Sequence, residues 1–325
     1  MTCRSLTKIS DLSLKDIDEI MKLGREYTSG KKSDILKKKI IINLFFESST
    51  RTLSSFEIAT KDLGANVIII PVDFSSVNKG EALVDTLRTL NAMKPDFVIV
   101  RHRCSGIMAI VAKNTKCSII NAGDGSYEHP TQALADCLVI EYFKSKIEGL
   151  KVAICGDILH SRVARSNIRL LSRLGAKVSI IGPPTLMCSN FPGVESVYYS
   201  LKEGIKDIDV LMLLRVQKER MKEGTFIPSE QEYFHLYGLN EEKLSYAKQD
   251  MIIMHPGPIN RGKEISYQLA NSNEVILKQV EFGLAVRKAV LHYFVVQNGS
   301  VLQTGSKTQL NFQSVRKENI KLRDD

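Results

Sequence analysis

Apolar residues follow two patterns along the chain: short runs rich in β-branched residues, and longer segments with apolar positions at helical spacing. In the first helical segment Leu14, Ile17 and Met21 share one face, after a capping-box pattern of Ser13 and Asp16. Strand-like runs lie at residues 39–45, 66–71, 97–101, 118–121, 151–155, 177–181, 210–214 and 251–255, and further helical patterns at residues 54–63, 80–93, 131–146, 161–174 and 283–297. Because strands that alternate with helices are typical of βαβ units, we expect an α/β fold with mainly parallel, doubly wound sheets.

The alternation restarts in the middle of the chain. A long helical pattern and the pair Gly149-Leu150 precede a fresh strand at residues 151–155, so we expect a domain boundary within residues 129–151. A length of 325 residues allows two domains. From Ser300 onward the chain is polar and turn-rich, which predicts a tail that is weakly ordered or packed on the surface.

Composition indicates a packed globular protein. Apolar residues make up 43% and charged residues 25% of the chain, unlike disordered or collagenous sequences. The longest apolar stretches, residues 40–46 and 67–72, are far shorter than the roughly 18–20 residues of a membrane span. The first ten residues have no apolar segment of the signal-peptide kind. We therefore expect a cytoplasmic protein with no membrane partner.

The net charge of +9 favours anionic partners. No block of five or six basic residues occurs, and aromatic residues do not interleave with arginines as a single-strand binding platform requires. We therefore expect small phosphates or carboxylates, not nucleic acid, as ligands.

The six cysteines indicate neither a metal site nor disulfides. They lie far apart, without a C-x-x-C pair or a histidine at ligand spacing. Cys137 and Cys155 fall inside apolar segments and are interpreted as small buried hydrophobic residues.

One motif combines hydroxyl groups with an arginine where a strand gives way to a helix. The strand ending near Phe46 and Glu47 is followed directly by the run from Ser48 to Thr52. Backbone N–H groups and the positive end of the helix dipole would make this turn an anion cradle. Ser49 and Thr50 could instead only cap the helix. A capping role would account for the hydroxyl side chains, but it does not account for the arginine between them at position 51.

Other polar residues also follow predicted strands. Such positions lie where open α/β sheets bind ligands. Taken singly, each residue is equally well explained as a surface or capping residue. Ser75 and Lys79 lie in a polar loop and, taken singly, are explained as solvent-exposed side chains. The G-x-G-x-x-G pattern of dinucleotide sites is absent from the chain. Together the residues at strand ends predict a cleft between two α/β domains that binds two anionic substrates; they are Arg101, His129, Gln132, Arg162, Arg215, Gln217, Pro256 and Gly257.

Five motifs make a resemblance specific. They are STRTxxSFExA at residues 49–59, SxxxKGE at 75–81, AGDGSxxHPTQ at 122–132, RVQKER at 215–220 and HPGPxNRG at 255–262. In order and spacing they resemble the catalytic chains of the aspartate carbamoyltransferase family, over residues 5–300. Ornithine carbamoyltransferases share the STRT and HPxQ elements, but they carry S-M-G in place of residues 215–217 and H-C-L-P in place of residues 255–258. The resemblance therefore favours aspartate as acceptor; another transcarbamoylase, or a non-catalytic anion-binding module that would lack site residues, are the alternatives.

The resemblance implies a role for each candidate residue. Carbamoyl phosphate would be bound by Ser49, Thr50, Arg51, Thr52, Arg101, His129 and Gln132, with Thr52, Arg101 and His129 stabilising the oxyanion formed when the aspartate amine attacks. Aspartate would be bound by Arg162, Arg215 and Gln217, and both substrates by the backbone of Pro256 and Gly257. Ser75 and Lys79 would reach into the site of a neighbouring subunit of a homotrimer, where Lys79 would also contact aspartate.

The resemblance also implies domain roles. Residues 1–133, completed by a helix at about 280–300, would bind carbamoyl phosphate, residues 134–279 would bind aspartate, and residues 301–325 would form the tail. No metal and no cofactor is implied, and a regulatory or pathway partner chain is left open. The sequence departs from the family at Ser48, Leu53 and Phe282, and the change at Leu53 puts nearby salt bridging in doubt.

Overall fold

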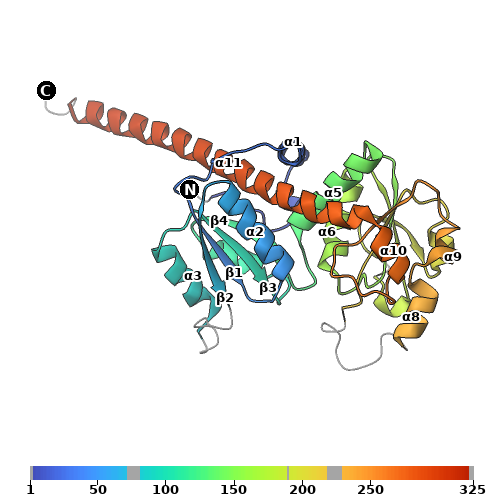
Figure 1. The fold of residues 1–325 in the computed structure, drawn as a ribbon. Helices are drawn as coiled ribbons and strands as arrows, with labels where there is room; N and C mark the ends of the chain where they lie inside the picture. Colours follow the sequence, from blue (N-terminus) through green and yellow to red (C-terminus); the bar gives the residue numbers. More distant parts are fainter. Residues whose placement is uncertain (1–2, 72–80, 189, 218–228, 322–325) are drawn as a thin grey trace.

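Two parallel β-sheets form the centre of the molecule (Figure 1). The computed structural model describes residues 3–71, 81–188, 190–217 and 229–321. The first sheet has the order β2-β1-β3-β4, from β1 (Ile40–Phe45), β2 (Asn66–Pro71), β3 (Phe97–His102) and β4 (Ser118–Asp124). The second has the order β7-β6-β5-β8-β9, from β5 (Lys151–Cys155), β6 (Lys177–Ile181), β7 (Val194–Tyr198), β8 (Val210–Leu213) and β9 (Ile252–Met254). All neighbouring strands pair in parallel, which confirms the predicted α/β fold.

The helices cover these sheets and connect their strands. They are α1 (Leu14–Thr28), α2 (Thr50–Asp62), α3 (Leu83–Ala92), α4 (Met108–Lys113), α5 (Pro130–Lys144), α6 (Arg162–Arg173), α7 (Leu201–Gly204), α8 (Glu230–Tyr237), α9 (Glu241–Leu244), α10 (Tyr267–Ser272) and α11 (Glu274–Lys321). The predicted capping box of α1 is confirmed, because the Asp16 N–H donates to Ser13 Oγ and the Ser13 N–H donates to the Asp16 carboxylate. None of the helices in the described part of the chain is long and apolar enough to cross a bilayer.

The largest apolar cluster runs from the first sheet to the second, and smaller clusters pack on the other faces of the two sheets. The largest cluster is built from strands of both sheets and from the inner faces of α1, α5, α6 and α11, with Phe56, Phe97 and Phe294 among its largest fully buried side chains. Cys137 and Cys155 are buried, as predicted from their apolar surroundings. Because the core is continuous, the two sheets are held close enough for their strand ends to face a common site.

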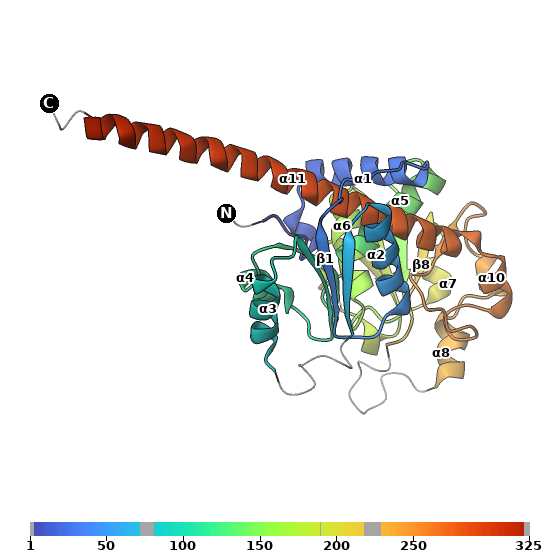
Figure 2. The ribbon, with the colours of Figure 1, turned by 60° about the vertical axis from the view of Figure 1, so that its left-hand side comes forward.

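Helix α11 differs from the sequence prediction at its C-terminal end. It crosses the molecule from the second sheet to the first and projects beyond the body (Figures 1 and 2). The prediction of a helix near residues 283–297 is confirmed, and the helix continues into the polar segment after Ser300, up to Lys321. No proline follows Pro258, and glycines such as Gly299 and Gly305 each cost a helix only about 1 kcal/mol relative to alanine. Nothing in the backbone therefore ends the helix where the polar composition begins.

Two further differences have local causes. Strand β7 was not predicted because it lies at the edge of its sheet, where its side chains are largely half-buried or exposed and give no apolar run. Helix α2 begins at Thr50, four residues before the predicted start. The hydroxyl–arginine motif is therefore the first turn of α2 itself. Leu53 packs against the core, and Phe282 stacks edge-to-face on Tyr142 at 5.2 Å between ring centroids, so both departures are accommodated as packing residues.

Candidate functional site

The carboxyl ends of strands from both sheets face a cavity of about 1210 Å³. Its walls come from the segments that follow β1, β3, β5, β8 and β9 and from the first turn of α5. All twelve described candidate residues line it: Ser49, Thr50, Arg51, Thr52, Arg101, His129, Gln132, Arg162, Arg215, Gln217, Pro256 and Gly257. The other two candidates, Ser75 and Lys79, lie outside the described residues. The structure therefore brings together side chains that are up to about two hundred residues apart in sequence.

The first turn of α2 lines this cavity with Ser49, Thr50, Arg51 and Thr52. Ser49 is the N-cap residue, yet its side chain makes no capping hydrogen bond to the helix. The interpretation of Ser49 as a simple cap is therefore wrong. A helix N-terminus attracts anions because its first N–H groups have no partner within the helix and its dipole is positive there.

Glu47 connects two of the candidate arginines. Its Oε1 atom accepts hydrogen bonds from Arg101 Nη2 at 2.8 Å and from Arg162 Nη2 at 2.5 Å. Arg101 follows the first sheet, and Arg162 begins α6 beside the second sheet. The carboxylate thus fixes the spacing of two guanidinium groups across the boundary between the sheets. Glu47 was not among the predicted site residues, although its position between a strand end and the hydroxyl–arginine motif was a usable signal.

A second link across the cavity runs from α2 to the turn after β9. Arg51 Nη1 donates to the Pro256 carbonyl oxygen at 2.8 Å. Gly257 adopts φ +69°, and a Cβ atom there would lie 1.6 Å from Arg51 Nη1. The ring of His255 stiffens the turn, since its Nδ1 accepts from the Gly257 N–H at 2.9 Å. Burial, together with the charges of Arg51 and Arg215, lowers the pKa of His255 to about 3, so the ring is neutral and its Nδ1 is an acceptor at neutral pH.

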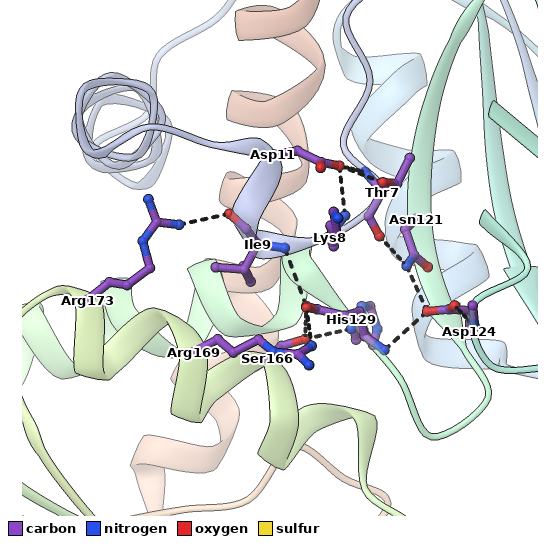
Figure 3. Close-up of polar contacts among 12 residues, drawn as sticks. Thr7, Lys8, Ile9, Asp11, Asn121, Asp124, His129, Ser166, Arg169 and Arg173 are labelled. Atoms are coloured by element: carbon purple, nitrogen blue, oxygen red, sulfur yellow. Dashed lines mark hydrogen bonds and ion pairs between the residues drawn. The ribbon is translucent and has the colours of Figure 1, made fainter. Parts of the chain in front are cut away.

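A network of hydrogen bonds and one ion pair fixes the backbone of the buried His129 (Figure 3). Its backbone N–H donates to Ser166 Oγ at 2.8 Å, and Ser166 Oγ donates to Glu128 Oε2 at 2.7 Å. Arg169 Nη1 pairs with Glu128 Oε1 at 2.5 Å, and the Ile9 N–H donates to Glu128 Oε2 at 3.4 Å. The start of α5 is therefore tied to α6 and to the N-terminal segment, which fixes where His129 enters the cavity.

Arg215 and Gln217 form the wall that follows β8. Arg215 Nη2 donates to Gln217 Oε1 at 3.2 Å. The Gln217 N–H donates to Oδ2 of the buried Asp157 at 3.0 Å. Both predicted residues are thus positioned by local contacts at the carboxyl end of the second sheet.

Arg287 of α11 also reaches the cavity and was missed by the sequence analysis. It is buried, its Nη1 donates to Ser55 Oγ at 3.0 Å, and burial lowers the pKa of its guanidinium to about 10, so it stays charged at neutral pH. Its position in the mostly apolar stretch from Phe282 to Phe294, next to Lys288, was the available signal.

The cavity is strongly positive. Six arginines line it, at positions 51, 101, 103, 162, 215 and 287, against the single carboxylate of Glu47 among the described lining residues. Such a concentration of guanidinium groups in a concave site favours ligands that carry several negative charges. Within the described ranges no group of three histidine, cysteine, aspartate or glutamate side chains could hold a metal ion.

Comparisons with known proteins agree with this geometry. The model of the "Aspartate/ornithine carbamoyltransferase, carbamoyl-P binding domain" matches residues 4–142, and that of the "Asp/Orn binding domain" of the same family matches residues 148–294. The aspartate carbamoyltransferase catalytic subunit of Wolbachia pipientis subsp. Culex pipiens (strain wPip) is 63% identical over 294 residues, which are 90% of this chain and 98% of the relative. That of Ehrlichia canis (strain Jake) is 54% identical over 297 residues, 90% of this chain and 97% of the relative.

Solved structures give the same result. Aspartate transcarbamoylase from Trypanosoma cruzi, in complex with carbamoyl phosphate and aspartate, is similar with a TM-score of 0.80 and 31% identity over 90% of this chain and 97% of that one. Ornithine carbamoyltransferase from Pyrococcus furiosus is similar with a TM-score of 0.77 and 25% identity over 89% of this chain and 96% of that one. The fold is thus shared by enzymes with both acceptors, whereas the Wolbachia and Ehrlichia relatives, at 63% and 54% identity, are both aspartate carbamoyltransferases.

Proposed function

Since the chain belongs to the aspartate/ornithine carbamoyltransferase family, we propose that it transfers the carbamoyl group of carbamoyl phosphate to the α-amine of L-aspartate. The products are N-carbamoyl-L-aspartate and phosphate, as in the second step of pyrimidine biosynthesis. The observation that carries this proposal is the convergence of the twelve described candidate residues on one arginine-rich cavity. The identity of 54–63% to aspartate carbamoyltransferase catalytic subunits supports aspartate as the acceptor.

The first turn of α2 binds the phosphate group in this proposal. Ser49, Thr50 and Thr52 offer hydroxyl and N–H donors, and Arg51 adds a positive charge. Arg101 bridges the phosphate and the carbonyl oxygen of carbamoyl phosphate. Residues 1–133, with the part of α11 near residues 280–300, form the carbamoyl-phosphate domain.

The wall from the second sheet binds aspartate. Arg162 and Arg215 pair with its two carboxylates, and Gln217 supports Arg215 through their hydrogen bond. Guanidinium groups suit this role because they can form two parallel hydrogen bonds to one carboxylate. The backbone of Pro256 and Gly257 contacts both substrates, and residues 134–279 form the aspartate domain.

The reaction proceeds by attack of the amine nitrogen on the carbamoyl carbon. The tetrahedral intermediate carries a negative oxygen, which Thr52, Arg101 and His129 stabilise. The C–O bond to phosphate then breaks, and the departing phosphate accepts the proton that the amine releases. Orientation and preorganised positive charge supply the catalysis, and removal of one such donor costs about 10²–10³ in rate.

The assembly is also a proposal. The chain forms a homotrimer in which Ser75 and Lys79 of one subunit complete the site of the next, and it acts in the cytoplasm. A cyclic trimer is a closed assembly of one repeated interface, as such a shared site requires. A regulatory or pathway partner chain is compatible with this arrangement.

Binding of a bisubstrate analogue tests whether one cavity holds both substrates. Isothermal titration with N-(phosphonacetyl)-L-aspartate is expected to give one site per chain. Arg51→Ala removes a contact to the phosphonate and Arg215→Ala a contact to the aspartyl end, so each variant should bind the analogue at least tenfold more weakly, as expected for a charge-assisted hydrogen bond. Wild-type affinity in either variant would contradict the proposed site.

A further inference from the structure

A buried carboxylate lies directly behind the candidate site. Asp136 is on α5, one turn after Gln132, and its side chain is fully buried. Three amide groups from three helices donate to it: Gln132 Nε2 and Gln279 Nε2 both reach Oδ1 at 2.9 Å, and Asn167 Nδ2 reaches Oδ2 at 2.8 Å. The contacts join α5, α6 and α11 at one point behind the cavity wall.

The direction of the hydrogen bond from Gln279 is determined by the backbone. The His255 N–H can only donate, and it donates to Gln279 Oε1 at 2.8 Å. The Gln279 amide nitrogen must therefore face Asp136, whose Oδ1 acts as an acceptor. Because Asp136 accepts, the Gln132 side chain also turns its amide nitrogen toward it. The Oε1 atom of Gln132 is consequently directed away from Asp136.

We propose that Asp136 is a positioning residue for carbamoyl transfer, which holds Gln132 so that its Oε1 accepts a hydrogen bond from the carbamoyl NH2 group. This inference rests on the proposed function and on the carbamoyl-phosphate-binding role that the family resemblance implies for Gln132, which lines the cavity. Gln279 also donates to Asp136 and accepts from the His255 N–H, but the positioning role proposed here acts through Gln132 alone.

Stability alone does not account for a carboxylate at this position. The neighbours of Asp136 on α5, Ala135 and Cys137, are buried and apolar. Burial raises the pKa of Asp136 to about 6, although the three amide hydrogen bonds and the charge of Arg287 act in the opposite direction. Compared with water, the folded protein therefore makes ionisation of Asp136 less favourable. The ionised form is nevertheless the one that accepts from all three amides.

A double-mutant cycle tests the inference, with kcat and KM for carbamoyl phosphate measured in each variant. Asp136→Ala is expected to lower kcat/KM for carbamoyl phosphate about tenfold, as the loss of one well-placed hydrogen bond does. Gln132→Ala should have a similar effect. In the Gln132→Ala background, Asp136→Ala should change kcat/KM less than twofold, because the side chain through which it acts is gone.

A matched control separates positioning from general destabilisation. Asn167→Ala removes a donor to the other oxygen of the same carboxylate and leaves Gln132 Nε2 bonded to Oδ1. It is expected to lower the melting temperature while keeping KM for carbamoyl phosphate within twofold. If Asp136→Ala does not fold, Asp136→Asn replaces it, since the amide keeps the size of the side chain and one acceptor oxygen. The decrease in kcat/KM should then be smaller than for alanine, and it should likewise disappear in the Gln132→Ala background.

The outcomes are distinguishable. Full additivity of the Asp136 and Gln132 effects, or an increase in KM in Asn167→Ala as large as in the Asp136 variant, would overturn the positioning role while leaving the site intact. Wild-type kinetics in Gln132→Ala alone would instead remove the role proposed for Gln132, and the inference with it.

Discussion

Arg162 Nη2 lies 2.5 Å from Glu47 Oε1, and this ion pair joins the first turn of α6 to the segment that follows β1. The Arg162 side chain is only 5% exposed and that of Glu47 25%, so the pair is largely shielded from water. Arg101 Nη2 contacts the same oxygen at 2.8 Å. One carboxylate therefore sets the distance between an arginine assigned to carbamoyl phosphate and one assigned to aspartate.

Replacement of Glu47 by glutamine should impair catalysis without unfolding the protein. The amide keeps the size of the side chain but loses its charge, and a shielded charge-assisted hydrogen bond is worth about 1.5–3 kcal/mol. We expect kcat/KM for aspartate to fall at least tenfold in steady-state kinetics. Glu57→Gln is the control, because Glu57 pairs with Lys61 on the surface of α2. Equal losses in both variants would show that Glu47 does not align the arginines.

Gly257→Ala should abolish most activity for a steric reason. The new Cβ atom would lie 1.6 Å from Arg51 Nη1, so Arg51 or the turn must move. Gly30→Ala is the matched control, since Gly30 also has positive φ, at +91°, but no heavy atom of the described residues lies within 4 Å of an added Cβ. Both variants should lose about 1 kcal/mol of unfolding free energy from backbone strain. Only Gly257→Ala should lose activity; similar activity in the two would refute the close approach.

If one wall of the cavity binds carbamoyl phosphate and the other binds aspartate, substitutions in the two walls should affect the constants for different substrates. Arg215→Ala should raise KM for aspartate at least tenfold and leave the affinity for carbamoyl phosphate within about threefold, because the proposed partner of Arg215 is a carboxylate of aspartate. Arg51→Ala should chiefly weaken carbamoyl phosphate binding. Initial rates with each substrate varied in turn give both constants. A variant that affects both substrates equally would contradict the assignment.

A shared site predicts recovery of activity in hybrid trimers. Lys79→Ala and Arg51→Ala trimers should each be nearly inactive, but in a trimer that holds both kinds of chain about one site in three combines an intact Arg51 with an intact Lys79. Activity should return after the two variants are dissociated and reassociated together, and not after mixing without exchange. Light scattering verifies the trimers. Verified hybrids without activity would exclude the shared site.

The pKa of Asp136 predicts how stability depends on pH. Burial raises this pKa from 3.8 to about 6, so the folded state holds the proton at pH values where the unfolded state has released it. Stability should therefore fall as pH rises from about 4 to 6, by up to roughly 3 kcal/mol, and level off above pH 6. Asp136→Asn cannot titrate and should lack this component. Urea denaturation of both proteins between pH 4 and 8 measures it, and parallel stability curves would contradict the raised pKa.

Much of the fold was predictable from local patterns. The strand ends could be located because apolar runs stop where polar residues begin, and parallel strands place those ends together, which is why Arg101 and Arg215 were found. Strand β7 escaped prediction because an edge strand lacks an apolar run. The length of α11 escaped because polar composition indicates exposure and does not by itself indicate an irregular backbone.

The partners of the candidate residues were less predictable. Glu47 and Arg162 are 115 positions apart, and Asp136 and Gln279 are 143 apart, so no local spacing connects them. A carboxylate or arginine within an apolar helix, such as Asp136 or Arg287, does indicate a buried polar contact. Which group it contacts depends on how α5, α6 and α11 pack, and that is a property of the tertiary structure.

The most direct measurement for the central claim is product analysis with two acceptors. Purified chain is incubated with carbamoyl phosphate labelled with 13C at the carbamoyl carbon and with either L-aspartate or L-ornithine, and the product is identified by NMR. We expect rapid formation of N-carbamoyl-L-aspartate, no citrulline above the uncatalysed rate, and loss of the aspartate product in Arg51→Ala. Formation of citrulline in preference to N-carbamoyl-L-aspartate, or no transfer to either acceptor by the folded protein, would contradict the proposed function.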